Sequence, residues 1–290
     1  MSAGATFRQI LAKKGLVEAM AAHSPLSARL AAEAGFDAVW ASGFELSAMY
    51  GVPDVSIVSM TQHLDMTRAM AERSGLPVVA DIDTGFGNAI NVLYAVEQYE
   101  RAGAAAIVME DKSFPKVTSL IAGGRQDMVR IEEFQGKIDA ARTARRDKDF
   151  VIVARTEALI AGLGQEEALK RARAYEAAGA DMILVHSKQK TPDEIESFVR
   201  AWSGKAPIVL VPTAYPEMNA QRIGALGKIR MVIYGNHAVR ASVTAMQQIF
   251  ARIRRDGGIH NVHAELVSVE EIFRLQGMER MKADETRFLK

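Results

Sequence analysis

One pattern in the sequence constrains the fold more than any other, and it occurs three times. The copies lie at residues 32–40, 100–108 and 176–184. In each, a predicted amphipathic helix ends at an alanine-glycine pair, and an apolar run begins within a few residues. Gly35, Gly103 and Gly179 suit helix C-caps, because that position needs a left-handed backbone. These glycines are 68 and 76 residues apart, about two strand-helix units each time, which predicts a chain of alternating strands and helices.

Eight apolar runs are predicted as parallel strands. They lie near residues 16–20, 38–42, 77–81, 106–110, 151–155, 182–186, 208–211 and 231–234. The helices predicted between them include residues 59–73, 90–102, 165–178 and 191–202. Apolar strands that alternate with helices about eight times indicate an α/β fold of the (β/α)8 TIM barrel type. A doubly wound sheet is the alternative, but no Gly-x-Gly-x-x-Gly motif opens a first helix.

The length of the chain and its C-terminal part complete the predicted fold. With 290 residues, 49% of them hydrophobic, the chain can build one large core, so we expect a single domain over residues 1–290. Residues 237–255 are predicted as a long helix, and residues 269–276 as a final amphipathic helix. The barrel itself needs no helices at about residues 237–290. We therefore expect them to pack on another subunit of a homo-oligomer, a dimer or tetramer.

The composition excludes several classes of function. The net charge is +1, so no overall field favours nucleic acid or an anionic membrane as a partner. The chain has no cysteine, which excludes disulfides, thiolate catalysis and zinc-thiolate sites. No apolar run approaches ~20 residues, and the N-terminal stretch lacks the apolar segment of a signal peptide. We therefore expect a cytoplasmic protein.

Acidic residues follow two neighbouring predicted strands. Asp81 and Asp83 are separated by one residue, so they face the same side if the strand continues, and Glu110 ends the next strand. Gly85 and Gly87 allow a sharp turn and the close approach of a ligand. Paired acids at strand ends suit a hard divalent cation such as Mg²⁺. The alternative is an aspartate-rich turn that only caps the next helix.

Further polar side chains fall at the ends of other predicted strands, where the active site of such a barrel lies. They include Ser42, Arg155, His186, Thr213 and Asn236, and Trp40 and Gly43 lie at the same strand ends. Taken alone, His186 is more often a hydrogen-bonded structural histidine, and Arg155 is often the ion-pair partner of an acid such as Glu157. Their convergence with the acids is the stronger signal, because an unpaired charge is costly to bury. Together they predict a site for a metal and an anionic substrate.

The segment at about residues 111–124 is too long for an ordinary turn between a strand and a helix. It ends in two glycines that can act as hinges. Such a segment predicts a mobile gating loop that excludes water from the site. Its side chains Lys116, Thr118 and Ser119 are then expected to close onto the substrate. An exposed variable loop explains the glycines, but not the polar side chains near the mouth of the barrel.

Over essentially its whole length, the chain resembles the phosphoenolpyruvate mutase and isocitrate lyase superfamily. The matching motifs are Asp81-Ile-Asp-Thr-Gly-Phe-Gly-Asn88, Glu110-Asp-Lys-Ser-Phe-Pro-Lys116, Glu132-Glu-Phe-Gln-Gly-Lys-Ile138, Ala154-Arg-Thr-Glu-Ala158 and His186-Ser-Lys188. The lyase branches of that superfamily place a catalytic cysteine in the gating loop. This chain has none, so the resemblance is to the mutase branch.

The resemblance implies an enzyme that depends on Mg²⁺, with Mn²⁺ or Co²⁺ as alternatives, and that acts on phosphonopyruvate. Asp81 would ligate the metal directly, and Asp83 and Glu110 largely through bound waters. The transferring phosphoryl group would be held by side chains that lie on three separate elements. These are Lys116, Arg155 and His186.

The resemblance also implies how the rest of the substrate is held. Trp40 would pack over the pyruvyl part, and Ser119 would contact the substrate from the gating loop. Backbone amides would add donors at Ser42, Gly43 and Phe44. Asp54 would lie near the phosphoryl group, where it orients a water or, less readily, attacks phosphorus.

Thr118 departs from the mutase branch, in which an asparagine stands at that position. Threonine has a smaller side chain with a hydroxyl, so it can make room for a water and orient it. The departure implies that the P–C bond is hydrolysed to pyruvate and phosphate, instead of the phosphoryl group moving from carbon to oxygen. Three alternatives remain open: the mutase (an isomerase), a cysteine-free 2-oxo-acid lyase or decarboxylase on the same scaffold, and a non-enzymatic barrel that binds a dicarboxylate.

Overall fold

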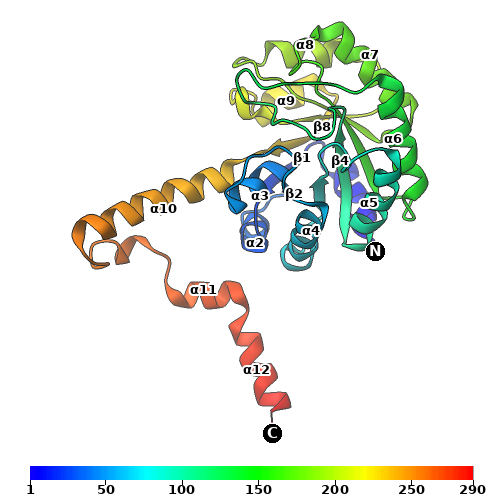
Figure 1. Ribbon diagram of the computed structural model, residues 1–290. Coiled ribbons are helices and arrows are strands. Elements are labelled where there is room, and N and C mark those ends of the chain that lie inside the picture. The colour runs from blue at the N-terminus through cyan, green and yellow to red at the C-terminus, as the bar shows by residue number, and fades with distance from the viewer. Residues whose placement is uncertain (290) are drawn as a thin grey trace. The chain divides into compact units, whose positions relative to one another are not determined.

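Eight parallel strands close into a barrel in the computed structural model, which describes residues 1–289 (Figure 1). The strands are β1 (Val17–Ala22), β2 (Ala38–Ala41), β3 (Val78–Asp81), β4 (Ala104–Glu110), β5 (Val151–Thr156), β6 (Met182–Val185), β7 (Ile208–Leu210) and β8 (Ile229–Tyr234). Each strand pairs with the next along the chain, and β8 pairs with β1. The predicted (β/α)8 TIM barrel is confirmed, and every predicted strand overlaps an observed one.

Helices connect the strands and cover the outside of the barrel (Figure 1). They are α2 (Pro25–Glu33), α3 (Gly43–Tyr50), α4 (Met60–Ser74), α5 (Ala89–Arg101), α6 (Ile131–Ala144), α7 (Gly164–Ala177), α8 (Asp193–Ala201) and α9 (Ala220–Leu226). The glycines of the three alanine-glycine pairs follow α2, α5 and α7 with φ between 86° and 99°, as the C-cap prediction requires. None of the helices within residues 1–289 is long and apolar enough to cross a membrane.

The amino end of the barrel is closed by α1 (Ala3–Lys13), a helix that the sequence analysis did not predict. Phe7 of α1 is fully buried and packs with inward-facing strand residues such as Val17 and Met231. Gly4 permits this close approach, because a Cβ there would lie 2.6 Å from the backbone of Asp149. With the amino end closed and the interior filled by apolar side chains, the opposite end is left for the polar site.

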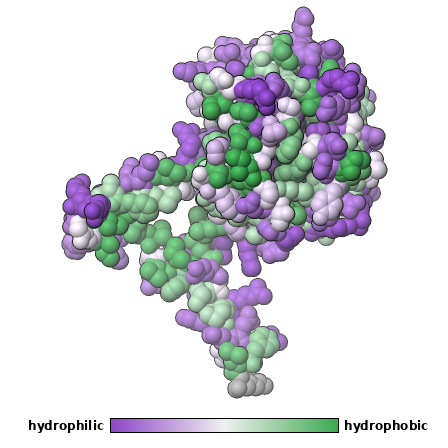
Figure 2. Space-filling view, in the orientation of Figure 1, coloured by the Kyte–Doolittle hydropathy of each residue, from purple (hydrophilic) through white to green (hydrophobic). Residues whose placement is uncertain are grey.

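The C-terminal helices are α10 (His237–Asp256), α11 (Val269–Gln276) and α12 (Met278–Phe288). Residues Met1–Val239 form one compact unit, and a second begins at Arg240. The prediction that residues 269–276 form the final helix is wrong, because Gly277 turns the chain with φ 77° and α12 follows. Apolar side chains are exposed along these helices, including Phe250 and Phe273 (Figure 2). The single domain over residues 1–290 stays a prediction.

Candidate active site at the carboxyl ends of the barrel strands

The loop after β3 brings two acids to the start of α3. Asp81 ends β3, and its Oδ2 accepts a hydrogen bond from Gly43 N at 3.3 Å. Asp83 adopts φ 50°, a left-handed conformation that is uncommon for a residue other than glycine. A Cβ at Gly43 would lie 3.1 Å from Asp83 Oδ1, so glycine lets α3 and the acidic loop meet. Ser42 caps α3 by accepting a hydrogen bond from Glu45 N, which leaves the amide of Gly43 directed at Asp81.

Lys116 of the gating loop carries a buried charge among these acids. Its Nζ lies 2.7 Å from Asp54 Oδ1 and 3.1 Å from Asp83 Oδ1. Burial opposes that charge, but the surrounding carboxylates outweigh it and raise the pKa of Lys116 well above its usual value. Burial also raises the pKa of Asp83 to about 7, although Lys116 acts to lower it. Burial raises the pKa of Asp81 in the same way.

These acids fit a hard divalent cation in the manner of Mg²⁺. Asp83 Oδ1 and Glu110 Oε1 are buried and accept no hydrogen bond. Each oxygen therefore has a lone pair available to a metal ion or to a water bound to it. Among residues 1–289, no three acidic or histidine side chains are close enough together to ligate one ion directly. Mg²⁺ usually keeps several of its waters and is bound through only one or two carboxylates. Both observations therefore fit an ion bound directly by Asp81 and through water by its neighbours.

Arg155, at the end of β5, is the centre of a buried network. Its Nε lies 2.6 Å from Glu157 Oε1 and 3.3 Å from Glu110 Oε2. Its Nη2 donates to Ser119 Oγ at 2.9 Å and lies 3.0 Å from His186 Nδ1. Although burial alone would raise it, Arg155 and Lys112 hold the pKa of the Glu157 carboxyl well below its ordinary value.

His186 follows β6 and faces the same network. Burial lowers the pKa of His186, so the neutral ring is favoured. Nδ1 lies 3.0 Å from Arg155 Nη2 and 3.4 Å from Glu157 Oε1, and because arginine, the nearer partner, can only donate, Nδ1 accepts and the proton of the neutral ring lies on Nε2. Nε2 is buried and has no hydrogen-bond partner within residues 1–289. It is therefore a free donor beside Arg155.

These groups surround a cavity of about 160 Å³ at the carboxyl end of the barrel. Its wall includes most of the predicted site residues: Trp40, Ser42, Phe44, Asp54, Asp81, Lys116, Thr118, Ser119, Arg155 and His186. Gly43 and Asp83 line a smaller adjoining space beside Asp81, and Glu110 lies in contact with Arg155. The structure thus brings all the predicted site residues together around one cavity.

The sequence analysis left Lys112 without a role, and it named Glu157 only as a possible ion-pair partner of Arg155, a pair that the structure contains. Lys112 Nζ lies 3.1 Å from Glu157 Oε2, and both side chains are buried. The spacing Arg155-x-Glu157 at a strand end was the available signal, because alternate residues of a strand face the same side. No signal marks Lys112, since a lysine beyond a strand end is usually solvated.

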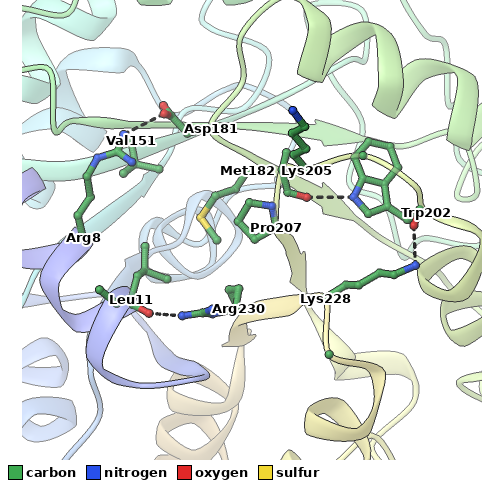
Figure 3. Close-up of a pocket in the computed structure, with 14 residues that line it drawn as sticks. Arg8, Leu11, Val151, Asp181, Met182, Trp202, Lys205, Pro207, Lys228 and Arg230 are labelled. Atoms are coloured by element: carbon green, nitrogen blue, oxygen red, sulfur yellow. Dashed lines mark hydrogen bonds and ion pairs between the residues drawn. The ribbon is translucent and has the colours of Figure 1, made fainter.

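A larger cavity of about 510 Å³ lies at the opposite, amino end of the strands (Figure 3). Three of the four basic side chains that line it are engaged with the protein itself. Arg8 Nη2 lies 2.8 Å from Asp181 Oδ1, Lys228 donates to the carbonyl oxygen of Trp202, and Arg230 donates to that of Leu11 (Figure 3). None of the predicted site residues lines it. The smaller cavity, which gathers the acids, Arg155 and His186, is therefore the candidate active site.

The fold is that of a (β/α)8 barrel enzyme, and the mouth of this barrel gathers buried acids and cations around one cavity. Residues 7–254 match the phosphoenolpyruvate phosphomutase family, and the chain belongs to it. The chain is 63% identical to a phosphonopyruvate hydrolase of Variovorax sp. (strain Pal2), over the full length of both chains. It is 43% identical to a phosphoenolpyruvate phosphomutase of Tetrahymena pyriformis, covering 97% of this chain and 94% of that protein. A crystal structure of phosphonopyruvate hydrolase with oxalate and Mg²⁺ matches with a TM-score of 0.95 at 61% identity, over all of both chains.

Proposed function

We propose that this chain is a Mg²⁺-dependent hydrolase that cleaves the P–C bond of 3-phosphonopyruvate to give pyruvate and phosphate. The observation that carries the proposal is the full-length 63% identity to a phosphonopyruvate hydrolase, against 43% to a mutase. Thr118 supports it, because this residue lines the cavity at the position where the mutase branch has asparagine. The reaction breaks the bond between C3 and phosphorus, and water supplies oxygen to phosphorus and a proton to C3.

The metal belongs at Asp81, with Asp83 and Glu110 acting largely through water. When bound, the ion supplies Lewis-acid stabilisation of the negative charge that develops on the pyruvyl oxygens as the bond breaks. The crystallised relative that holds oxalate and Mg²⁺ supports Mg²⁺ as the ion, and Mn²⁺ and Co²⁺ remain alternatives. The amides at Ser42 and Phe44 add donors for the same developing charge, whereas the amide of Gly43 is engaged with Asp81.

The phosphoryl group faces the cationic side of the cavity. Arg155, Lys116 and the free Nε2 proton of His186 provide charge and hydrogen bonds to its oxygens. Trp40, which is buried at the cavity wall, packs over the pyruvyl part. Ser119 serves the substrate only indirectly, because its hydroxyl is engaged with Arg155 and Glu157.

The attacking group is a water that Thr118 orients. Asp54 is the other candidate, either as a second orienting group or as a nucleophile. Both carboxylate oxygens of Asp54 contact Lys116 Nζ, at 2.7 and 2.8 Å. This ion pair makes the carboxylate a weaker nucleophile and favours water as the attacking group.

The experiment that tests the function is phosphorus NMR of the purified protein with phosphonopyruvate and Mg²⁺. A hydrolase produces inorganic phosphate, and pyruvate accumulates in equal amount. If phosphoenolpyruvate is the main product instead, the chain is a mutase, which is the second candidate because of its 43% identity to one. If neither product forms while pyruvate-type 2-oxo acids are cleaved, the lyase alternative applies.

We further propose that the protein is a cytoplasmic homo-oligomer assembled through α10–α12. The support is the number of apolar side chains exposed on these helices, among them Phe250 (64% exposed) and Phe273 (45%). Phe250→Asp should lower the molar mass measured by light scattering after size exclusion, while Arg254→Glu, a charge change on the same helix, serves as the matched control. A monomeric mass for the unaltered protein would contradict the proposal.

A further inference from the structure

Lys112 is a buried lysine that does not line the active-site cavity. Its side chain is 1% exposed. Its ammonium donates to Val117 O and to Ser119 Oγ, both at 2.8 Å, and pairs with Glu157 Oε2 at 3.1 Å. A buried ammonium is costly unless it is both paired and hydrogen-bonded, and here three partners match its three N–H groups. Two of the three partners belong to the gating loop.

The backbone at Lys112 is fixed to the barrel on both sides. On one side, Asp111 accepts hydrogen bonds from Glu157 N at 2.8 Å and from Tyr175 Oη at 2.6 Å. On the other side, Lys112 forms a β-bridge with Met128. Lys112 therefore lies at the base of the loop, where the backbone is tied down, and its partners Val117 and Ser119 lie further along the loop.

Apolar packing contributes little to holding the gating loop in place. Phe114, Leu120 and Ile121 are 50%, 44% and 54% exposed, so little apolar burial stabilises the closed position. Ser119 Oγ concentrates the polar contacts, since it also accepts from Arg155 at 2.9 Å and donates to Glu157 Oε2 at 2.5 Å. Hydrogen bonds to buried charges, rather than packing, hold the loop over the cavity.

We infer that Lys112 is a positioning residue that latches the gating loop closed. It holds Val117 and Ser119, and the residue between them is Thr118, whose side chain lines the cavity. The latch therefore fixes the hydroxyl that orients the attacking water, so the inference rests on the proposed function and deepens it. Lys116 tethers the loop separately through Asp54 and Asp83, which are groups of the cavity itself.

The test uses Lys112→Met, which keeps the length of the side chain and removes its charge, and Ser119→Ala, which removes the hydroxyl that Lys112 contacts. Trypsin cleavage after Lys116, which is 7% exposed, reports opening of the loop, and cleavage after Arg280 on α12, whose side chain is 91% exposed, provides an internal reference. With Mg²⁺ and oxalate present, we expect each variant to raise the ratio of Lys116 to Arg280 cleavage about 10-fold. Lys170→Met, at an exposed helix position, is the matched control.

The same variants are expected to lower kcat for phosphonopyruvate by about 10- to 100-fold, because the loop closes over the substrate less often. The double variant Lys112→Met/Ser119→Ala should change the cleavage ratio by less than the product of the two single effects, since the two residues share one contact. A purely structural role would lower the thermal midpoint and leave the cleavage ratio unchanged. Ser119→Thr, which keeps the hydroxyl, should restore part of the protection.

Two outcomes overturn the inference: an unchanged cleavage ratio in Ser119→Ala, or effects of the two substitutions that multiply in the double variant. If Lys112→Met does not fold, Ser119→Ala and its threonine counterpart still decide the question. The oxalate assay involves no turnover. If the protein makes phosphoenolpyruvate, the proposed function is refuted and the role of Lys112 in closing the loop is not. If Lys112 has no such role, the identity of the product is unchanged.

Discussion

His63 provides a quantitative test of the physical reasoning, because its ring is buried in a setting that suits only the neutral form. Its Nε2 lies 3.2 Å from Ala41 O, and its Nδ1 lies 2.7 Å from Tyr99 Oη. The carbonyl oxygen can only accept, so Nε2 carries the proton and Nδ1 accepts from the tyrosine hydroxyl. Protonating Nδ1 would require Tyr99 to turn its hydroxyl away. Burial, with a smaller contribution from Lys116, lowers the pKa of His63 to about 4.

The sign of the stability effect follows from the pKa in the two states. The folded value of about 4 lies below the unfolded value of about 6.5, so the unfolded chain binds the proton more readily. The contribution to stability is therefore complete above about pH 6.5, and it is lost as the pH falls from 6.5 through 4. The full contribution is about 3 kcal/mol, of which about 2 kcal/mol is lost between pH 7 and pH 5.

The perturbation is His63→Gln, which keeps a polar side chain and removes the titration. Urea unfolding is measured at pH 7, 6 and 5 by tryptophan fluorescence, because Trp40 and Trp202 both lie in the barrel and are buried. The unaltered protein should lose about 2 kcal/mol more than the variant between pH 7 and 5. His260→Gln, at an exposed position, is the matched control. If the unaltered protein and His63→Gln lose stability equally over this range, the reasoning is refuted.

Three further predictions concern the active site. Protein treated with a chelator should be inactive and should regain activity with Mg²⁺, and full activity in excess chelator would contradict the metal site. Asp83→Ala should weaken metal affinity about 10- to 100-fold, and Asp81→Ala should weaken it more. Trypsin should cut after Arg125 mainly in the ligand-free protein, and equal cleavage with and without oxalate argues against gating. Thr118→Ala should lower phosphate release by ~100- to 10,000-fold with metal binding intact, Thr118→Ser should retain more activity, and Thr118→Asn should yield traces of phosphoenolpyruvate in phosphorus NMR. If Thr118→Ala hydrolyses at the original rate, Asp54 becomes the leading candidate for orienting water.

The barrel was predictable from the sequence because its strands are buried on both faces. Every residue of β4 is buried, so the strand is an uninterrupted apolar run up to its terminal Glu110. The helices outside this pattern were harder to recognise. In α1, Phe7, Ile10 and Leu11 form an apolar stripe at helical spacing, but it is short and no strand pattern precedes it. In α12 no residue is buried.

The gathering of the site residues was predictable for a related reason. The carboxyl ends of parallel strands meet at one rim of a barrel, so polar residues at successive strand ends become neighbours. What the sequence does not reveal is which charges are buried against each other. Nothing in the sequence around Lys112 shows that its ammonium is enclosed, and the orientation of the Ser119 hydroxyl depends on contacts with Arg155 and Glu157.

The balance of charge at the rim explains why these residues call for a divalent ion. The carboxylates in contact there are Asp54, Asp81, Asp83, Glu110 and Glu157, and the cations are Lys112, Lys116 and Arg155. Since His186 is favoured as the neutral ring, five negative charges face three positive ones. Without a further cation, proton binding relieves this excess of negative charge. The neighbouring carboxylates therefore add to the effect of burial, which raises the pKa of Asp83 to about 7. A single divalent ion cancels the excess, and an anionic substrate can then enter a rim that would otherwise repel it.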